Sequence, residues 1–542
     1  MSKKGFAGTQ HLVRLLLRLD RIKLTLWLLG LLTLVAITPF SLRAIIDAEA
    51  EKRAVPTAQV LAEQAQLLET NGASIALQGP PDALDTFGGR YAFEIGAFTL
   101  AIVALMNILL IARHTRSEEE SGRAELVRAA SVGPWSALAA VGIVALAANV
   151  ILGLGTSAVF IADGQAAGRT LLYGASLTLC GLLFAAIALI WVQVFEYSGA
   201  ATGASLAVVA VAFALRAIGD VRDSWLSMVS PLGWVQAVNA FGDVVVWPFV
   251  VSILAIAAAI GVAITFAARR DVGAGMIQQR PGPAVARSSL GTPLGFAWRL
   301  QRSTLLWWTV GAMFVGGIYG SVISAIDDFV EDNEAMLEVL EGLGMSGDQL
   351  RDGFITVILS MTGIIATAGV IQSLLRPRNE EVAGRAEPVL ATAISRRTWL
   401  MSHMAFTALA APALMVAAGI GLSVTDALVV GQFTDFSETI AAALARVPAL
   451  WAVAGIGVLL YGWARRLALI AWGVFALVAI IFLFGDLLRL PDQAMNVSPI
   501  RHVTHLPASD QSWLSIIVLC TIALVTATTG IALFERRDLD TA

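Results

Sequence analysis

Two short charged segments hold the side chains best suited to specific chemistry. The pattern E-E-x-x-G-R-A-E occurs at residues 118–125 and, with the same central spacing, at residues 380–387. Carboxylates and arginines form charge-assisted hydrogen bonds, and a glycine allows another backbone to approach closely. Because the pattern recurs at matching positions, we expect both copies to dock on another protein. The alternative is a solvated loop whose acids balance neighbouring arginines. The predicted docking residues are Glu118, Glu119, Gly122, Arg123 and Glu125, and Glu380, Glu381, Gly384, Arg385 and Glu387.

Long hydrophobic segments must position these loops. Hydrophobic residues make up 57% of the 542 residues and charged residues 14%, whereas soluble domains hold about a quarter charged residues. A membrane-spanning helix needs roughly 20 apolar residues. The sequence therefore predicts an all-α integral membrane protein with about twelve transmembrane helices. The expected spans are 25–42, 91–112, 136–160, 171–195, 200–218, 247–267, 304–326, 353–375, 401–424, 443–463, 466–488 and 514–534.

Basic residues indicate the orientation of these spans. With the N-terminus inside, the predicted cytoplasmic segments hold 25 of the 36 lysines and arginines, which favours cytoplasmic N- and C-termini. Residues 1–24 lack the small-residue cleavage site of a signal peptide. In this segment the leucines and arginines fall on different helix faces, which is typical of an amphipathic helix on the cytoplasmic membrane surface. The alternative is a plain basic flank of the first span.

Four sequence matches in the same order show that the chain repeats itself. Residues 18–21 (RLDR) recur as 299–302 (RLQR), 118–125 as 380–387, 230–232 (SPL) as 498–500 (SPI), and 269–271 (RRD) as 536–538. They predict six-helix halves at 25–267 and 299–534, joined by a cytoplasmic linker at 268–298 and followed by a tail at 535–542. With six spans each, both halves point the same way and are related by a pseudo-two-fold axis along the membrane normal.

Several kinds of site are not predicted. A phosphate-binding loop needs a Gly-rich turn ending in Gly-Lys-Ser or Gly-Lys-Thr, and none of the four lysines lies in one. Any nucleotide hydrolysis must therefore come from a separate subunit. His502 and His505 lack an evident third metal ligand, and no basic patch with stacking aromatics predicts nucleic-acid binding. We expect no catalytic residue, cofactor or metal in this chain.

Polar side chains inside predicted spans are candidates for a transport pathway. Such groups are costly in hydrocarbon, so they tend to face a cavity or the interior of a helix bundle. Asn107, Asn149 and Gln372 lie deepest in their predicted spans. Hydrogen bonding between helices is an equally good explanation of these three residues.

The loops and two further segments give the chain a family resemblance. These are HTRSEEESGRAELVRAASVGP, RPRNEEVAGRAEPVLATAISRR, SPLGWVQAVNAF at 230–241 and SPIRHVTHLPA at 498–508. Over essentially its whole length the chain resembles actinobacterial ATP-binding-cassette permeases of the polyketide-antibiotic (tetronasin-type) exporter branch of the type-2 exporters. The resemblance implies two copies of a separate cytoplasmic ATPase, which bind ATP and Mg and contact the paired loops. It also implies outer gate helices at Ser230, Pro231, Ser498 and Pro499.

The expected function is that of a cell-membrane permease subunit in an ATP-driven exporter working by alternating access. Its expected substrates are amphiphilic or hydrophobic compounds such as polyketide antibiotics or drugs. A proton-coupled secondary drug transporter has the same six-plus-six architecture, but it generally carries a basic, Gly-rich signature between spans two and three, where this chain has EEESGRAE. A lipid exporter fits the sequence equally well.

Overall fold

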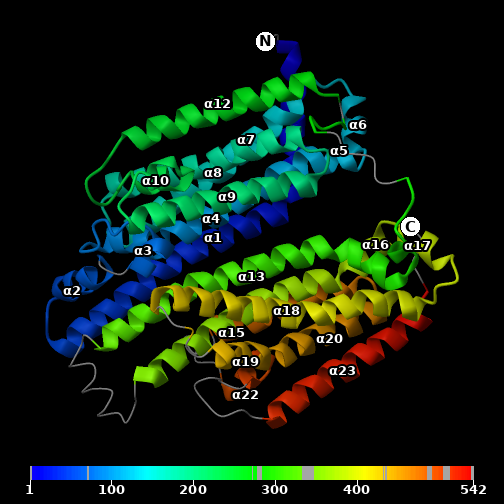
Figure 1. Ribbon diagram of the computed structural model, residues 1–542. Coiled ribbons are helices and arrows are strands. Elements are labelled where there is room, and N and C mark those ends of the chain that lie inside the picture. The colour runs from blue at the N-terminus through cyan, green and yellow to red at the C-terminus, as the bar shows by residue number, and fades with distance from the viewer. Residues whose placement is uncertain are drawn as a thin grey trace. The chain divides into compact units, whose positions relative to one another are not determined.

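The fold is helical and divides into two compact units, Met1–Gly282 and Pro283–Ala542, each described here by itself (Figure 1). The boundary between the units lies inside the predicted linker, 268–298. The computed structural model describes residues 3–69, 72–271, 273–277, 284–331, 347–430, 433, 436–484, 491–503 and 513–538. Within these ranges there is no strand, and a single isolated bridge joins Phe195 to Ile277. His505 lies outside the described residues.

Six long helices form the first unit, one on each span predicted for the first half. They are α1 (Thr9–Arg53), α4 (Phe87–Ala112), α7 (Ser136–Ala162), α8 (Ala167–Val194), α9 (Ser198–Val221) and α12 (Trp247–Arg269). Shorter helices are α2 (Thr57–Glu69), α3 (Gly72–Gln78), α5 (Glu118–Glu120), α6 (Arg123–Arg128), α10 (Leu226–Val229) and α11 (Pro231–Gln236).

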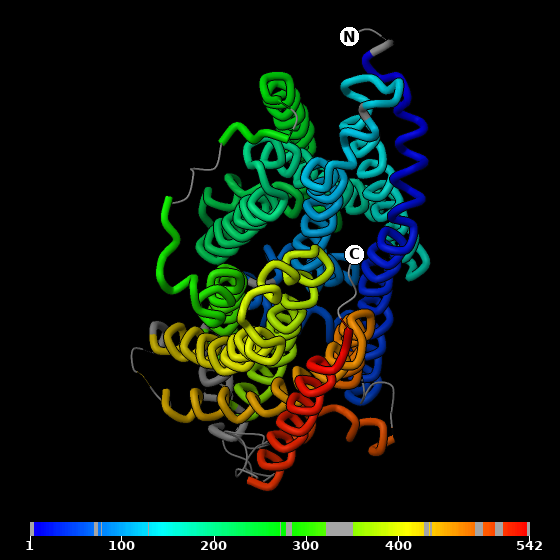
Figure 2. Tube along the Cα trace, turned by 90° about the vertical axis from the view of Figure 1, so that its right-hand side faces the viewer, coloured from blue at the N-terminus to red at the C-terminus, as the bar shows by residue number. Residues whose placement is uncertain are grey.

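The second unit repeats this order. Its longer helices are α13 (Pro293–Glu331), α15 (Gly347–Leu374), α18 (Arg396–Val430), α19 (Phe436–Ala445), α20 (Val447–Trp463), α21 (Ile470–Phe484) and α23 (Trp513–Arg536). The shorter ones are α16 (Arg376–Val382), α17 (Ala386–Leu390), α22 (Asp492–Met495) and the 3-10 turn η5 (Pro499–His502). In this unit α20 and α23 pack side by side (Figure 2).

Ten helical segments of the described chain are long and apolar enough to cross a membrane. Six lie in the first unit and four in the second: Arg351–Val382, Arg396–Ala427, Phe436–Trp463 and Trp513–Arg536. This confirms an all-α, multi-pass membrane protein. The predicted spans 304–326 and 466–488 fall on α13 and α21, which are not among the ten. These ten segments are two fewer than the twelve transmembrane helices predicted from the sequence.

The amphipathic segment at the N-terminus is continuous with the first span. Helix α1 runs for 45 residues from Thr9 to Arg53, so no break separates residues 9–24 from the expected span at 25–42. Along the amphipathic part, Leu15, Leu19 and Ile22 remain exposed. Whether this part lies on the membrane surface stays a prediction.

Small residues let neighbouring helices approach closely in both units. A Cβ atom on Gly153 of α7 would lie 2.4 Å from the carbonyl oxygen of Gly174 on α8. In the second unit, a Cβ on Gly462 of α20 would lie 1.9 Å from the carbonyl oxygen of Gly530 on α23. Helices in lipid associate largely through such close packing, because lipid tails are as apolar as leucine. Alanine at these positions would force the helices apart.

An ion pair joins three helices at the end of the first unit opposite the loop after α4. Arg43 of α1 donates to Asp163 through Nε at 3.0 Å and Nη2 at 2.8 Å, and the Tyr91 hydroxyl of α4 donates to the same carboxylate at 2.7 Å. Asp163 directly follows α7. Burial alone would raise the pKa of Asp163, but the hydrogen bonds from Arg43 and Tyr91 outweigh it and hold that pKa below its ordinary value.

Replacing Asp163→Asn should destabilise the protein by about 1–2 kcal/mol near neutral pH, because a charge-assisted pair is lost while Arg43 is partly screened by solvent. A carboxyl with a lowered folded-state pKa stabilises the fold above its unfolded pKa of about 3.9, and this contribution disappears as pH falls through the folded pKa. Below about pH 4 the thermal midpoints of wild type and variant in detergent should therefore converge.

The exposed Asp85 provides the matched control, since Asp85→Asn should leave the midpoint unchanged at either pH. A difference between wild type and Asp163→Asn that is the same at pH 7 and at pH 3 would contradict this assignment.

Candidate functional site

The two charged segments form helical turns that directly follow the second long helix of each unit. Loop 1, residues 113–128, begins with a π-helical turn at Arg113–Ser117 that continues α4, and then forms α5 and α6. Loop 2, residues 376–390, follows α15 and forms α16 and α17. The sequence repeat thus corresponds to a repeat of local structure.

The glycine of each loop is needed for its backbone conformation. Gly122 has φ 72° and Gly384 has φ 69°, values in the left-handed region that L side chains rarely adopt. Nothing lies within 4 Å of an ideal Cβ at either position. That these glycines let a partner's backbone approach closely stays a prediction. They allow the chain to reverse between two short helices.

In loop 1 the second glutamate is buried in an arginine network. Arg270, at the end of α12, donates to Glu119 through Nη2 at 2.7 Å and Nη1 at 2.9 Å, and Arg116 donates to Glu119 at 2.6 Å. Arg270 also donates to the amide oxygen of Gln193 at 2.5 Å. The side chains of Glu119 and Arg270 are each 9% exposed. Loop 1 is thus fixed to the end of the last long helix of its unit.

Loop 2 contains the same arrangement. Arg537, just after α23, donates to both oxygens of Glu381 at 2.9 and 2.8 Å, and the Tyr461 hydroxyl donates to Glu381 at 2.8 Å. The Glu381 side chain is 4% exposed. The Arg537 guanidinium lies 5.2 Å from the ring centroids of both Tyr461 and Phe534. We call Glu119–Arg270 and Glu381–Arg537 the latch pairs.

A second arginine fixes each loop to another turn of its unit. Arg116 donates through Nε to the carbonyl oxygen of Phe195 at 2.7 Å, and Arg378 donates through Nε to that of Arg465 at 3.1 Å. Arg116 and Arg378 occupy the same position of the repeat, 262 residues apart. Phe195 and Arg465 lie in the turns that follow α8 and α20. Each loop therefore connects three helix ends.

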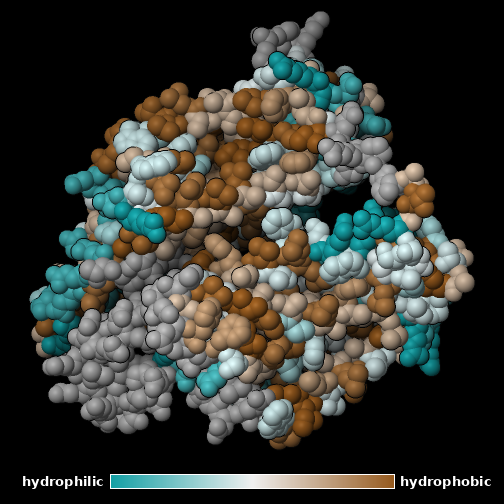
Figure 3. Space-filling view, viewed as in Figure 1, coloured by the Kyte–Doolittle hydropathy of each residue, from teal (hydrophilic) through white to brown (hydrophobic). Residues whose placement is uncertain are grey.

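Burial divides the predicted docking residues into two groups. The Glu119 and Glu381 side chains are only 9% and 4% exposed and are paired inside the chain, and their predicted contact with another protein stays a prediction. The Arg123 and Arg385 side chains are 64% and 61% exposed, and Glu125 and Glu387 are exposed as well. Polar residues gather on the surface near α6 and α16 (Figure 3).

The first glutamate of each motif pairs with the exposed arginine of the same loop. Glu118 lies 3.1 Å from Nε of Arg123, and Glu380 accepts from Nε of Arg385 at 2.7 Å. Arg376 also lies 3.0 Å from Glu380. Hydrogen bonding to Glu380 raises the pKa of Arg385 above its ordinary value. Each exposed arginine is thereby held at a defined place on the surface of its loop.

The loops differ at the third position of the motif. Glu120 accepts hydrogen bonds from the backbone N–H of Ser198 and, at 3.1 Å, from its hydroxyl. Ser198 is the first residue of α9, and a carboxylate at a helix N-terminus is favourable because the helix dipole is positive there. Val382 occupies this position in loop 2 and is 48% exposed. The third carboxylate therefore attaches loop 1 to one more helix.

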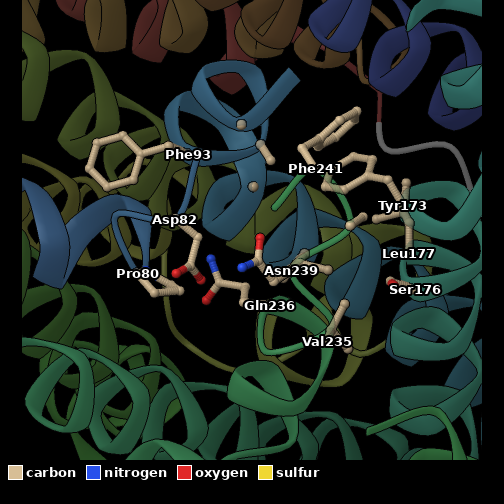
Figure 4. A pocket seen from close by; sticks show the side chains of 15 residues that line it. Pro80, Asp82, Phe93, Tyr173, Ser176, Leu177, Val235, Gln236, Asn239 and Phe241 are labelled. Atoms are coloured by element: carbon tan, nitrogen blue, oxygen red, sulfur yellow. The ribbon is translucent and has the colours of Figure 1, made fainter. Parts of the chain in front are cut away.

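The Ser-Pro segments begin short helices in both units. Ser230 accepts from the backbone N–H groups of Leu232 and Gly233, which caps α11, and donates to the carbonyl oxygen of Ala212 at 2.6 Å. Ser498 and Pro499 begin η5 without a side-chain cap. Helix α11 helps to close a small cavity of about 50 Å³, in which Asp82, Gln236 and Asn239 lie close together and Tyr173 lies against Phe241 (Figure 4). A role of these helices as gates stays a prediction.

The three candidate pathway residues have different surroundings. Asn107 of α4 and Asn149 of α7 are fully buried and exchange two hydrogen bonds of 3.0 and 2.8 Å. Each amide also donates to a backbone carbonyl of its own helix. This geometry supports the packing role for both. Gln372 is exposed on α15 and accepts from the indole N–H of Trp308, and its place in a transport pathway stays a prediction.

Sequence reasoning did not assign the partners of the buried glutamates. The repeated Arg-Arg-Asp pattern contains Arg270 and Arg537, but served only as evidence of duplication. The occurrence of this pattern together with the loop motif in both halves was the sequence signal that could have identified these partners. No comparable signal pointed to Tyr461. In the described part of the chain, no group of three His, Cys, Asp or Glu side chains could hold a metal ion.

Comparison with known proteins gives two matches. Residues 290–535 match the family described as multidrug efflux system permease Rv1217c, C-terminal domain. Across 536 residues, covering 99% of this chain and 96% of the relative, the sequence is 33% identical to the multidrug efflux system permease protein Rv1217c of Mycobacterium tuberculosis (strain ATCC 25618 / H37Rv). Near-complete coverage of both chains, together with the long apolar helices and the repeated loops, identifies this protein as a member of the multidrug efflux permease family of the cell membrane.

Proposed function

We propose that this chain is the membrane-spanning permease subunit of an ATP-driven exporter whose ATPase is a separate cytoplasmic protein. Two copies of that ATPase would bind ATP and Mg and dock on loops 1 and 2. The observation that carries this proposal is the duplicated loop structure, in which a buried latch pair holds an exposed arginine and an exposed glutamate in each half. The relative's name, an efflux system permease, supports a role within a larger transport system.

The proposed topology has twelve spans with both termini in the cytoplasm. Helices α13 and α21 supply the two spans beyond the ten segments that meet the length and hydropathy limits. The distribution of basic residues then places both loops on the cytoplasmic side, where an ATPase can reach them.

Alternating access is the proposed mechanism. ATP-dependent association of the two ATPase subunits displaces loops 1 and 2, and the latch pairs transmit this displacement to α12 and α23. Coupling of this kind requires that nucleotide or substrate binds one conformation more tightly than the other. The proposed substrates are amphiphilic or hydrophobic compounds such as drugs and polyketide antibiotics, with lipid as an alternative cargo.

One buried pair favours a second candidate function, proton-coupled transport. Asp20 of α1 and His114 of loop 1 are buried and hydrogen-bonded to each other, and Arg113 lies 3.1 Å from Asp20. Buried ionisable residues within a membrane protein are typical of proton pathways as well as of structural ion pairs. In the second half, Gln301 occupies the position of Asp20 and does not titrate, so this carboxylate–imidazole pair has no direct counterpart there.

Affinity purification of the tagged permease from its native cell in mild detergent tests the main proposal. We expect two soluble ATPase subunits per permease, and ATP hydrolysis that changes when a transported drug is added. Recovery of the permease alone would contradict the proposal if drug export also survived deletion of the ATPase gene and stopped with a protonophore. That outcome would establish the proton-coupled alternative.

The latch pairs should contribute strongly to stability. Glu381→Ala leaves the buried Arg537 without its carboxylate, a change that typically costs about 3–5 kcal/mol. We therefore expect a clearly lower thermal midpoint in detergent and lower drug export at equal membrane abundance. The matched control is Glu387→Ala, which removes an exposed carboxylate from the same loop and should leave the midpoint unchanged. Equal midpoints for the two variants would refute the structural role of Glu381.

The exposed arginines should matter for ATPase binding and not for folding. The double variant Arg123→Glu with Arg385→Glu reverses one exposed charge in each loop without removing a latch pair. We expect the thermal midpoint of the isolated permease to stay within a few degrees of wild type, while recovery of the ATPase during purification falls at least tenfold. Recovery of a full complement of ATPase would rule out these residues as the docking surface.

A further inference from the structure

The first unit contains a cavity of about 520 Å³ beside the latch pair of loop 1. Its walls come from the amphipathic part of α1, from loop 1, from the start of α7 and from the end of α12. Apolar side chains cover most of the wall and include Leu12, Leu16, Leu19, Val127, Leu138 and Val141. Ligand pockets in proteins typically measure about 300–1,000 Å³, so the space suits one small organic molecule.

One end of this cavity is polar and predominantly acidic. Glu119, Arg270 and Gln193 form part of the wall, and within the latch pair the charges of Glu119 and Arg270 balance. Glu118 and Asp271 also line the cavity, and Asp271 is exposed. His114 lines it too, but is hydrogen-bonded to Asp20. Glu118 is paired with Arg123, and Glu119 with Arg116 and Arg270. The exposed Asp271 is therefore the carboxylate that favours a ligand with a positive charge at this end.

In the second unit, aromatic side chains occupy the space that corresponds to this cavity. Trp399, Tyr461 and Phe534 form a buried aromatic stack, with Phe534 at 5.8 Å from Trp399 and 5.4 Å from Tyr461 between ring centroids. All three side chains are at most 2% exposed. This stack packs next to Arg537 and so fills the space beside the latch pair of loop 2.

The sequence repeat gives the counterparts of these aromatics. Counting 262 residues back through the loop motif, Trp399 corresponds to Ala137. Counting 267 residues back through the Arg-Arg-Asp motif, Phe534 corresponds to Ala267. Both alanines line the cavity of the first unit. Two large aromatic side chains of the second half are thus replaced by methyl groups at the walls of this space.

We propose that this cavity is a binding site for one amphiphilic organic cation. The apolar body of the ligand lies against the leucines of α1 and the start of α7, and its positive nitrogen faces Asp271. The site exists in the first half and is filled by aromatic side chains in the second. Because it is built from the permease alone, the proposal does not depend on an ATPase partner.

Filling the cavity with the side chains of the second half tests this site. The double variant Ala137→Trp with Ala267→Phe should remove one saturable binding site per chain for rhodamine 6G, a hydrophobic cation, measured by equilibrium dialysis in lipid nanodiscs with empty nanodiscs as background. The matched control is Ala147→Trp with Ala258→Phe, which places the same side chains at exposed positions of α7 and α12 outside the cavity. Equal binding by the two double variants would overturn the proposal.

A second measurement locates the ligand and keeps the proposal testable if the filled variant does not fold. In a Cys520→Ala background, in which Cys180 is buried, Ala137→Cys should react with a maleimide, and rhodamine 6G should slow that reaction at least fivefold. Ala286→Cys, at an exposed position outside the long helices, should react at the same rate with and without the cation. An Ala137→Cys reaction rate that rhodamine 6G does not change would overturn the site.

The acidic end is tested separately. Asp271→Asn should weaken binding of rhodamine 6G severalfold at low ionic strength, and added salt should reduce the difference from wild type. Unchanged affinity in this variant would overturn the assignment of the ligand as a cation. None of these measurements uses an ATPase, so their failure is distinguishable from failure of the proposed ATP-driven mechanism.

Discussion

Each half depends on one carboxylate–guanidinium pair. The pair joins the loop after the second long helix to the end of the last long helix of that half. The two charges are nearly removed from water, and such pairs hold only when geometry and further hydrogen bonds compensate for lost hydration. Arg116 and Gln193 supply these bonds in the first half, and Tyr461 supplies one in the second. The position of each exposed arginine and glutamate follows from this pair.

The helical architecture was largely predictable from the sequence because hydrocarbon imposes one strong constraint. Backbone polar groups in lipid must be satisfied within the segment, so long apolar stretches form helices. Each predicted span overlaps a long helix of the described chain. The count of spans was less predictable, because α21 is short for a membrane-spanning helix.

The site was only partly predictable. Repetition identified the loop motif, but a sequence pattern does not distinguish a carboxylate that faces solvent from one that pairs internally. Glu119 and Glu125 belong to the same motif, yet only Glu119 is reached by an arginine from 151 residues further along the chain. The same holds for Asn107 and Asn149, whose pairing depends on the packing of α4 against α7. Such partners become visible only when the helices are placed together.

The two halves keep their latch pairs while their surroundings have diverged, and this difference has a physical explanation. A buried ion pair tolerates no loss of either partner, whereas the space beside it can be filled by aromatics, as with Trp399 and Phe534, or left open, as with Ala137 and Ala267. An open space costs packing energy unless something occupies it. The leucines and the acidic side chain that face this space favour an occupant with an apolar body and a positive charge. The asymmetry is therefore best explained as a binding site that one half carries and the other has closed.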